Sequence, residues 1–345
     1  MNFDIDNRTI LRVRHGSQAY GTSTPESDLD VKGVCIEPIA QQIGFLHSFE
    51  QHERMANKGH DCDLVIFSLK KFAKLAAECN PNIIEILFVD DSDVMFIDEY
   101  GEELRSHRND FLSKKARFTF SGYGHAQLKR IKTHRAWLLN PPKNAPSRVD
   151  FGLQERSSIS KTDLGAFEAL GDEATLLLNS NVVDVFTREK RYQAAKKHWD
   201  QYNTWLHERN PTRAALEAKH GYDTKHAGHL IRLMRMCREI LETGQVLVRR
   251  PDAEELLAIR RGKWEYERVI EEAEKLDALC GELYKTSTLR NEPDRVALDK
   301  LVTSMTMRYE LEHGEDMFEV DRIFTQKPDG PALRILKEGQ VPPKP

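Results

Sequence analysis

The sequence has few of the features that mark exported, membrane-bound or disulfide-stabilised proteins. Within its 345 residues no apolar run approaches the length of a membrane span, and the first twenty residues lack the profile of a signal peptide. Its five cysteines are scattered and never form a C-x-x-C pair, which argues against a disulfide framework or a zinc ribbon. We therefore expect a cytoplasmic protein without a membrane partner, long enough for two domains.

Acidic residues are missing from one long stretch. The net charge of the chain is −4, yet residues 111–149 contain no Asp or Glu. The basic residues of this stretch are Lys114, Lys115, Arg117, Lys129, Arg130, Lys132, Arg135, Lys143 and Arg148, interleaved with Phe118, Phe120, Tyr123 and Trp137. Such a segment suits a phosphate-rich partner, and we take Lys129, Arg130, Lys132 and Arg135 as candidate RNA contacts. An exposed helix face with countercharges elsewhere explains the pattern equally well.

The hydrophobic pattern divides the chain into two parts. In residues 1–112 it predicts strands at 10–13, 29–36 and 63–67, and a helix from Leu69 to Glu78 that Ser68 caps. Beyond residue 112 it predicts helices at 123–139, 166–170, 183–210, 213–220, 225–243, 253–259 and 263–283. It is least well defined after Asp294. The predicted fold class is α+β, with a mixed sheet flanked by helices in 1–112 and a mainly helical region in 113–345.

One motif in the first part carries chemistry. Gly16-Ser17 is followed, after ten residues, by Asp28-Leu29-Asp30. Glycine permits a tight turn with close backbone approach, and serine adds a hydroxyl beside the N–H groups of a following helix, which suits a triphosphate. Two aspartates separated by one strand residue point to the same face. They can share two Mg²⁺ ions, the arrangement that clamps the attacking and leaving oxygens in phosphoryl transfer.

This order of turn, Gly-Ser, spacer and D-h-D resembles the signature of the DNA polymerase β nucleotidyltransferase superfamily. The resemblance implies a polymerase β-like catalytic domain in residues 1–112 that uses an NTP and Mg²⁺. It also implies a third carboxylate from a neighbouring strand, which holds one metal ion and helps to deprotonate the attacking hydroxyl. Asp63 is favoured for this role because it begins an apolar run, and Asp61 is the alternative.

A narrower resemblance covers roughly residues 10–290. It rests on the strings HGSQAYGTSTPESDLDVKGV, DLVIFSLKKFAKLAAECNPNIIEILF, PPKNAPSRVDFGL and GYDTKHAGHLIRLMRMCREIL. These are similar to a family of nucleotidyltransferases associated with RNA ligases and RNA repair. The resemblance implies a helical C-terminal region, a role in RNA end repair or modification, and RNA-ligase pathway proteins as partners.

A second group of candidates lies on the predicted helix 225–243. Lys225, His229 and Arg232 fall within about 60° of one another on a helical wheel. Apolar residues occur on both sides of this helix, which predicts packing between two layers. The three cationic or polar side chains are candidates for nucleotide binding, and an exposed face that only keeps the helix soluble is the alternative. Glu85 is expected to form a cap or a salt bridge, and neither His15 nor His60 is expected to bind metal.

Three functions are compatible with these features. The first is Mg²⁺-dependent transfer of a nucleoside monophosphate from an NTP to the hydroxyl of an RNA end, releasing pyrophosphate. The second is the same transfer to a protein side chain, of the AMPylation type, which needs no basic groove. The third is a nucleotide- or RNA-binding module without turnover. The choice of NTP, the end of the RNA, template dependence and the oligomeric state stay open at this point.

Overall fold

A five-stranded sheet forms the centre of the N-terminal part. The computed structural model describes residues 3–314 apart from 26, 46, 56–61 and 158. The strands are β1 (Thr9–His15), β2 (Asp30–Cys35), β3 (Gln51–Arg54), β4 (Asp63–Ser68) and β5 (Val94–Ile97), in the order β3-β4-β2-β1-β5. β2 and β4 run parallel, whereas the other neighbours are antiparallel. The sheet is therefore mixed, as the sequence predicted.

Helices flank this sheet, and their starts follow from local capping. They are α1 (Gly16–Tyr20), α2 (Ile39–Ile43), α3 (Leu69–Ala77), α4 (Pro81–Phe88) and α5 (Glu99–Ser106). The Ser68 hydroxyl accepts the backbone N–H of Lys71 and so caps α3. Asn80 caps α4 in the same way, and Pro81 occupies its first turn, where a missing N–H costs nothing.

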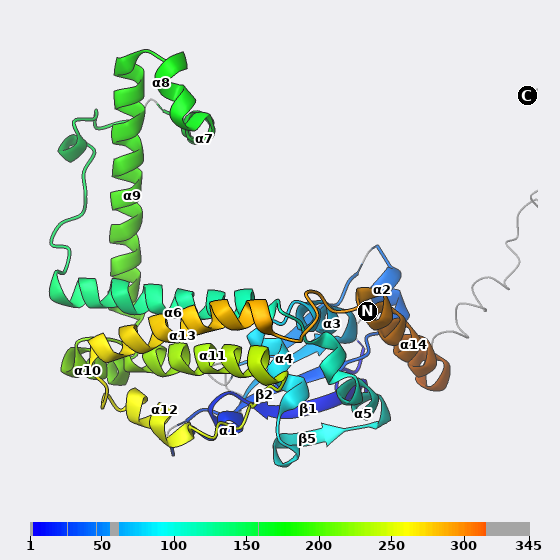
Figure 1. The fold of residues 1–345 in the computed structure, drawn as a ribbon. Coiled ribbons are helices and arrows are strands. Elements are labelled where there is room, and N and C mark those ends of the chain that lie inside the picture. Colours follow the sequence, from blue (N-terminus) through cyan, green and yellow to red (C-terminus); the bar gives the residue numbers. More distant parts are fainter. Residues whose placement is uncertain (1–2, 26, 46, 56–61, 158, 315–345) are drawn as a thin grey trace, which may run out of the picture.

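The remainder of the described chain is helical. Its helices are α6 (Ala116–Leu139), α7 (Lys161–Leu170), α8 (Ala174–Leu177), α9 (Ser180–Glu208), α10 (Pro211–His220), α11 (Thr224–Thr243), α12 (Ala253–Arg260), α13 (Tyr266–Thr286) and α14 (Arg295–His313). α11 packs against α6, α12 and α13 and is buried on both sides, which confirms the predicted packing between layers. α9 leaves this bundle as a long arm that carries α7 and α8 at its far end (Figure 1).

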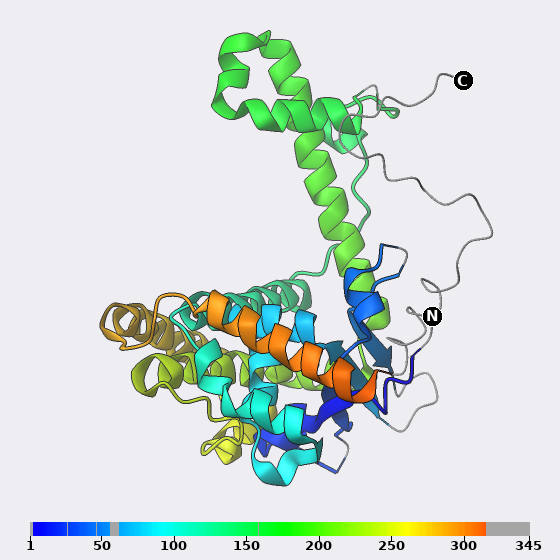
Figure 2. The ribbon, with the colours of Figure 1, turned by 90° about the vertical axis from the view of Figure 1, so that its right-hand side faces the viewer.

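The last described helix returns to the sheet. α14 lies against α3, and Figure 2 shows it crossing the N-terminal part. The Tyr309 hydroxyl donates to the carbonyl of Asn7, 3.2 Å away, and Glu310 pairs with Arg8. One apolar core therefore joins the sheet, α3, α4, α11 and α14. The domain division at residue 112 stays a prediction, and this core crosses it.

None of the helices in the described residues has both the length and the apolar character that a membrane span requires.

Candidate active site

Two aspartates stand side by side where two parallel strands begin. β2 starts at Asp30 and β4 at Asp63, and these two residues are partners in the parallel ladder. Partners on neighbouring strands are about 4.8 Å apart, and their side chains lie on the same face of the sheet. Asp28, two residues before Asp30, is exposed. The backbone N–H of Asp63 donates to the carbonyl of Leu29 at 3.0 Å, which ties β4 to the D-h-D motif. Asp61 lies outside the described residues.

The charged side chains at the start of β2 and β4 influence one another's pKa. The pKa of Asp30 is raised, first by burial and then by the negative charges of Asp63 and Asp28. Lys32 and Lys225 act in the opposite direction without cancelling this shift. Three carboxylates that repel one another in this way fit a divalent cation, because hard oxygen ligands are those that Mg²⁺ prefers. Asp28, Asp30 and Asp63 are thus the residues that would hold it.

Gly16 lets the Asp30 carboxylate approach the backbone. Its φ is +64°, and a Cβ atom placed there would lie 2.1 Å from Oδ2 of Asp30. His15, the preceding residue, is the antiparallel partner of Asp30, so β1 delivers Gly16-Ser17 beside the acids. The expected turn is the start of α1, a helix of only five residues. Backbone N–H groups and the half-buried Ser17 hydroxyl are therefore the groups this turn can offer to a phosphate.

α11 presents its first turn to the carboxylates. Lys225 is exposed, and its charge lowers the pKa of Asp30, which places the ammonium in the field of the acids. His229, one turn further along, is half-buried; burial and then the Arg232 charge lower its pKa to about 3. Arg232 itself is buried and forms an ion pair with Glu85 at 2.5 Å. Of the three predicted nucleotide contacts, Lys225 and His229 are thus accessible, whereas Arg232 lies beneath them.

The basic stretch is divided in the structure. Lys129, Arg130 and Lys132 are exposed on α6, and no ion pair within the described residues involves them. The Arg130 charge lowers the pKa of both His226 and His229, after the larger effect of burial, so Arg130 lies on the side of α6 that faces α11. Arg135 is held in the bundle: it stacks 4.1 Å from the Tyr266 ring centroid and donates to the carbonyl of Gly221.

Other basic residues of the stretch have countercharges from distant elements. Arg117 pairs with Asp277 at 3.0 Å, and Arg148 pairs with Glu189 at 2.6 Å. Lys115 pairs with Glu78 at 2.6 Å. Both interpretations of the stretch therefore apply, to different residues: an internally paired part, and an exposed part around Arg130.

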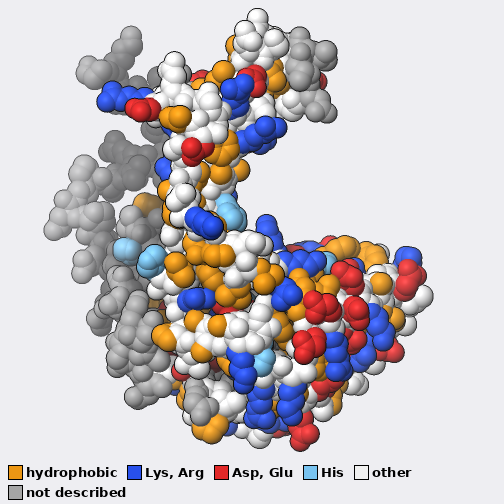
Figure 3. All heavy atoms as spheres, turned by 90° about the vertical axis from the view of Figure 1, so that its left-hand side faces the viewer, with side chains coloured by type: hydrophobic (Ala, Val, Ile, Leu, Met, Phe, Trp, Pro, Cys, Tyr) orange, Lys and Arg blue, Asp and Glu red, His pale blue; other side chains and the backbone are white. Residues whose placement is uncertain are grey.

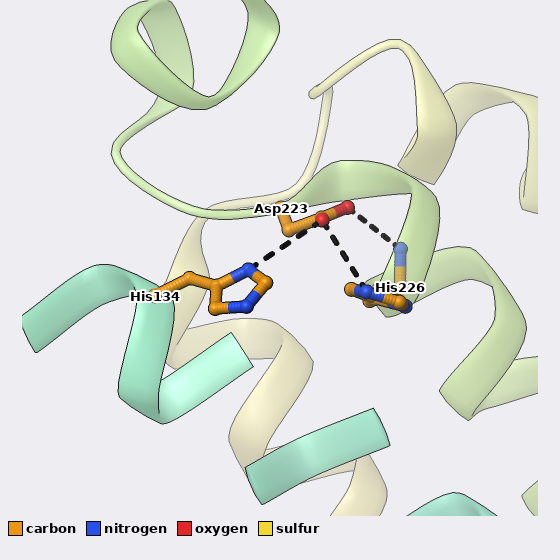
Figure 4. A group of neighbouring side chains, drawn as sticks. All are labelled: His134, Asp223 and His226. Atoms are coloured by element: carbon orange, nitrogen blue, oxygen red, sulfur yellow. Dashed lines mark hydrogen bonds and ion pairs between the residues drawn. The ribbon is translucent and has the colours of Figure 1, made fainter. Parts of the chain in front are cut away.

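A group of two histidines and an aspartate lies at the start of α11 (Figure 4). His134 of α6 and His226 of α11 approach Oδ2 of Asp223 to 3.9 and 3.5 Å. The same oxygen already accepts two contacts from the Arg213 guanidinium, at 2.5 and 2.8 Å. A cation between the histidines would face this guanidinium at short range. The arrangement is better explained as a buried ion pair between Asp223 and Arg213, with the two histidines beside it, than as a metal centre.

Sequence comparison identifies the class of protein to which this site belongs. The model of a polymerase-β-like family matches residues 3–138, the segment that carries all three candidate carboxylates and most of α6. That family is the RNA repair pathway DNA polymerase beta family, RlaP. The match confirms the predicted resemblance and indicates a nucleotidyltransferase.

One curated relative is a protein of Enterobacteria phage T4, described as an uncharacterized 38.9 kDa protein in the nrdC-mobD intergenic region. It is 33% identical over 85 residues, which are 23% of this chain and 25% of the phage protein. The similarity thus spans about a quarter of that relative. No solved structure matches the chain.

The ion pair between Arg232 and Glu85 was not predicted from the sequence. The sequence predicted a cap or a salt bridge for Glu85, and the structure confirms a salt bridge with Arg232. The two residues are 147 positions apart, and no local pattern connects them.

Proposed function

We propose that the protein is a Mg²⁺-dependent nucleotidyltransferase that moves a nucleoside monophosphate from an NTP to a hydroxyl group of an RNA end. The pairing of Asp30 with Asp63 across two parallel strands, with Asp28 beside them and Lys225 in their field, is the observation that carries this proposal. The match of residues 3–138 to the RlaP family model supports the chemistry, and the family's name supports RNA repair as its setting.

In this reaction the acceptor hydroxyl oxygen forms a bond to the α-phosphorus, and the bond from that phosphorus to the bridging oxygen of pyrophosphate breaks. Asp63 accepts the hydroxyl proton. Bound Mg²⁺ ions supply charge neutralisation at the triphosphate and at the attacking and leaving oxygens. Gly16 and Ser17 donate hydrogen bonds to phosphate oxygens, and Lys225 and His229 bind the triphosphate from the other side of the site.

The RNA acceptor is assigned to the exposed part of α6. Lys129, Arg130 and Lys132 are exposed there, and Arg130 lies on the side towards His229. α6 runs from the sheet to the foot of the arm, and the space-filling view shows the arm standing over the body with an open, concave side (Figure 3). Exposed cations beside a catalytic site suit a nucleic acid backbone, which needs phosphate contacts and little sequence readout.

The transferase is tested by incubating the protein with each labelled NTP, Mg²⁺ and a pool of small RNAs. We expect label to enter RNA with the wild type and not with Asp28→Asn/Asp30→Asn. Label that enters protein instead would favour the side-chain acceptor. NTP binding without transfer to either acceptor would contradict the enzyme and favour a binding module.

The RNA acceptor is tested separately by a salt titration of RNA affinity. Lys129→Gln/Arg130→Gln/Lys132→Gln should lower the slope of log affinity against log salt by about 2 to 3, because each phosphate contact contributes about one. Lys70→Gln/Lys74→Gln/Lys300→Gln removes the same charge from exposed positions on α3 and α14 and serves as the control. Equal effects of the two triple variants would remove α6 as the RNA surface.

A further inference from the structure

A group of buried polar side chains lies beneath the candidate site. Glu85 of α4 is fully buried; it accepts hydrogen bonds from the Tyr20 hydroxyl at 2.6 Å and from Arg232 at 2.5 Å. His15 Nε2 is 3.3 Å from the same carboxylate. The Arg232 guanidinium also lies over the Tyr20 ring, 3.8 Å from its centroid. Glu85 thus connects α11 with both ends of the segment that carries Gly16-Ser17.

Another contact of Arg232 involves a candidate nucleotide ligand. Its second terminal nitrogen is 3.2 Å from Nδ1 of His229. A guanidinium has only donors and stays protonated, so the histidine nitrogen must be the acceptor. An imidazole that accepts at Nδ1 is neutral and carries its hydrogen on Nε2. The contact therefore defines both the charge and the tautomer of His229.

We propose that Glu85 and Arg232 are positioning residues that hold His229 as a neutral imidazole with its hydrogen on Nε2, ready to donate that hydrogen to a phosphate oxygen of the bound NTP. The identity of this ligand rests on the proposed function, whereas the tautomer rests on the contact alone. The low pKa of His229, caused by burial and by the Arg232 charge, agrees with a neutral ring.

A purely structural role would not need this arrangement. A buried Arg–Glu pair is often no more stable than an apolar pair of similar volume, so the fold alone does not explain it. Here each end of the pair touches a residue of the candidate site region. Glu85 contacts Tyr20 and His15, which flank Gly16-Ser17, and Arg232 contacts His229. The pair thereby fixes His229 relative to the turn that is assigned to the phosphates.

The tautomer is tested by ¹⁵N chemical shifts of the histidine rings at pH 7, with the His229 signals assigned through His229→Gln. We expect protonation of Nε2 only in the wild type. In Glu85→Gln/Arg232→Met, which keeps the side-chain volumes without the charges, we expect a mixture of tautomers. A wild-type ring protonated on Nδ1, or a double variant with an unchanged tautomer, would overturn the positioning role.

The function of the tautomer is tested by the affinity of each Mg·NTP, measured by calorimetry. His229→Leu should bind about 10-fold more weakly, because a hydrogen bond to a charged phosphate is lost, and His229→Gln should lose less. The double variant should lose affinity only in proportion to the fraction of His229 that no longer carries its hydrogen on Nε2, about 2-fold for an equal mixture of tautomers. Arg148→Met/Glu189→Gln removes a largely buried ion pair on the arm and is the control. Unchanged affinity of a folded double variant would overturn the proposal. A wild type that binds no NTP refutes the proposed function, and the ring shifts still decide the tautomer.

Discussion

Two groups of charged residues lie one behind the other at the junction of the sheet and α11, and they are built in opposite ways. At the start of the central strand β2, burial and the neighbouring acids Asp63 and Asp28 raise the pKa of Asp30. Behind it, burial alone would raise the pKa of Glu85, but the Arg232 charge, the nearby His15 ring and a hydrogen bond from Tyr20 lower it below its ordinary value.

The difference separates an outer group that can bind a ligand from an inner group that supports it. The outer group is Asp28, Asp30 and Asp63, and the inner group is Glu85 and Arg232 with His15 and Tyr20. The inner carboxylate has its cation within the chain, so it is already stabilised before any ligand arrives. The outer carboxylates raise one another's energy, and a divalent ion that binds between them would relieve that cost. Substitutions in the outer group should therefore affect catalysis most strongly, and those in the inner group should affect stability most strongly, with a smaller loss of NTP affinity through His229.

The largest expected effect is loss of catalysis in the outer group. Asp30→Asn should lower the rate of nucleotide transfer by about 10³-fold or more, since metal-ion stabilisation of the transition state is worth several kcal/mol. Its stability without metal should not fall, because the substitution removes a repelled charge. Transfer assays and urea unfolding of the same preparation measure the two quantities.

Asp299→Asn, at an exposed position on α14, is the matched control and should leave both quantities unchanged. An Asp30→Asn protein that unfolds more easily than the wild type would break the distinction between the two groups.

In the inner group the expected loss is in stability. Arg232→Met leaves Glu85 buried without its cation and should cost about 3–5 kcal/mol in the free energy of unfolding. Glu85→Gln/Arg232→Met should recover most of this loss, because no buried charge then lacks a partner. Urea titration of the two single variants and the double variant completes the cycle. Additive losses would mean that the pair does not act as a unit.

The sequence predicted the fold class and most helices, and the elements it missed have weak patterns for physical reasons. β3 reads Gln-His-Glu-Arg at the edge of the sheet, so it has no apolar alternation to detect. α14 buries Met305 and Tyr309 while Val296 and Leu311 stay exposed, which spreads its apolar residues around the helix. Both elements depend on contacts with distant parts of the chain, β3 on β4 and α14 on α3.

The candidate site was predictable as far as local rules extend. Two aspartates separated by one strand residue share a face, and this places Asp28 and Asp30 together. That Asp63 lies beside Asp30 depends on β2 and β4 being parallel neighbours. The resemblance implied a carboxylate on a neighbouring strand, but neither it nor any periodicity predicted that the two strands run parallel. The burial of Arg232 was not predicted, because its partner Glu85 lies in a different part of the chain.

A smaller effect is expected at the turn that faces the outer group. Gly16→Ala places a methyl group against the Asp30 carboxylate and forces a residue other than glycine into a left-handed conformation. The conformation alone should cost about 1–2 kcal/mol of stability, and displacement of Asp30 should also weaken Mg²⁺-dependent NTP binding. Gly122→Ala, where an added methyl group meets no other atom within 4 Å, controls for the substitution. Equal NTP affinity in both variants would contradict the close approach.

The smallest effect is expected at Lys32, whose pKa is influenced by both groups. Lys32 donates to the carbonyl of Asn82, and burial lowers its pKa to about 8 although Glu85 and Asp30 both act to raise it. Because the folded protein releases this proton at a lower pH than the unfolded chain does, stability from this group should increase as the pH rises above 8. The wild type should gain about 1 kcal/mol relative to Lys32→Met between pH 8 and pH 9. Urea unfolding at closely spaced pH values measures this gain. If the difference in free energy of unfolding between the wild type and Lys32→Met does not change with pH, the surrounding acids stabilise the Lys32 ammonium as fully as water does. The outer and inner groups would then be less separate than their pKa shifts indicate.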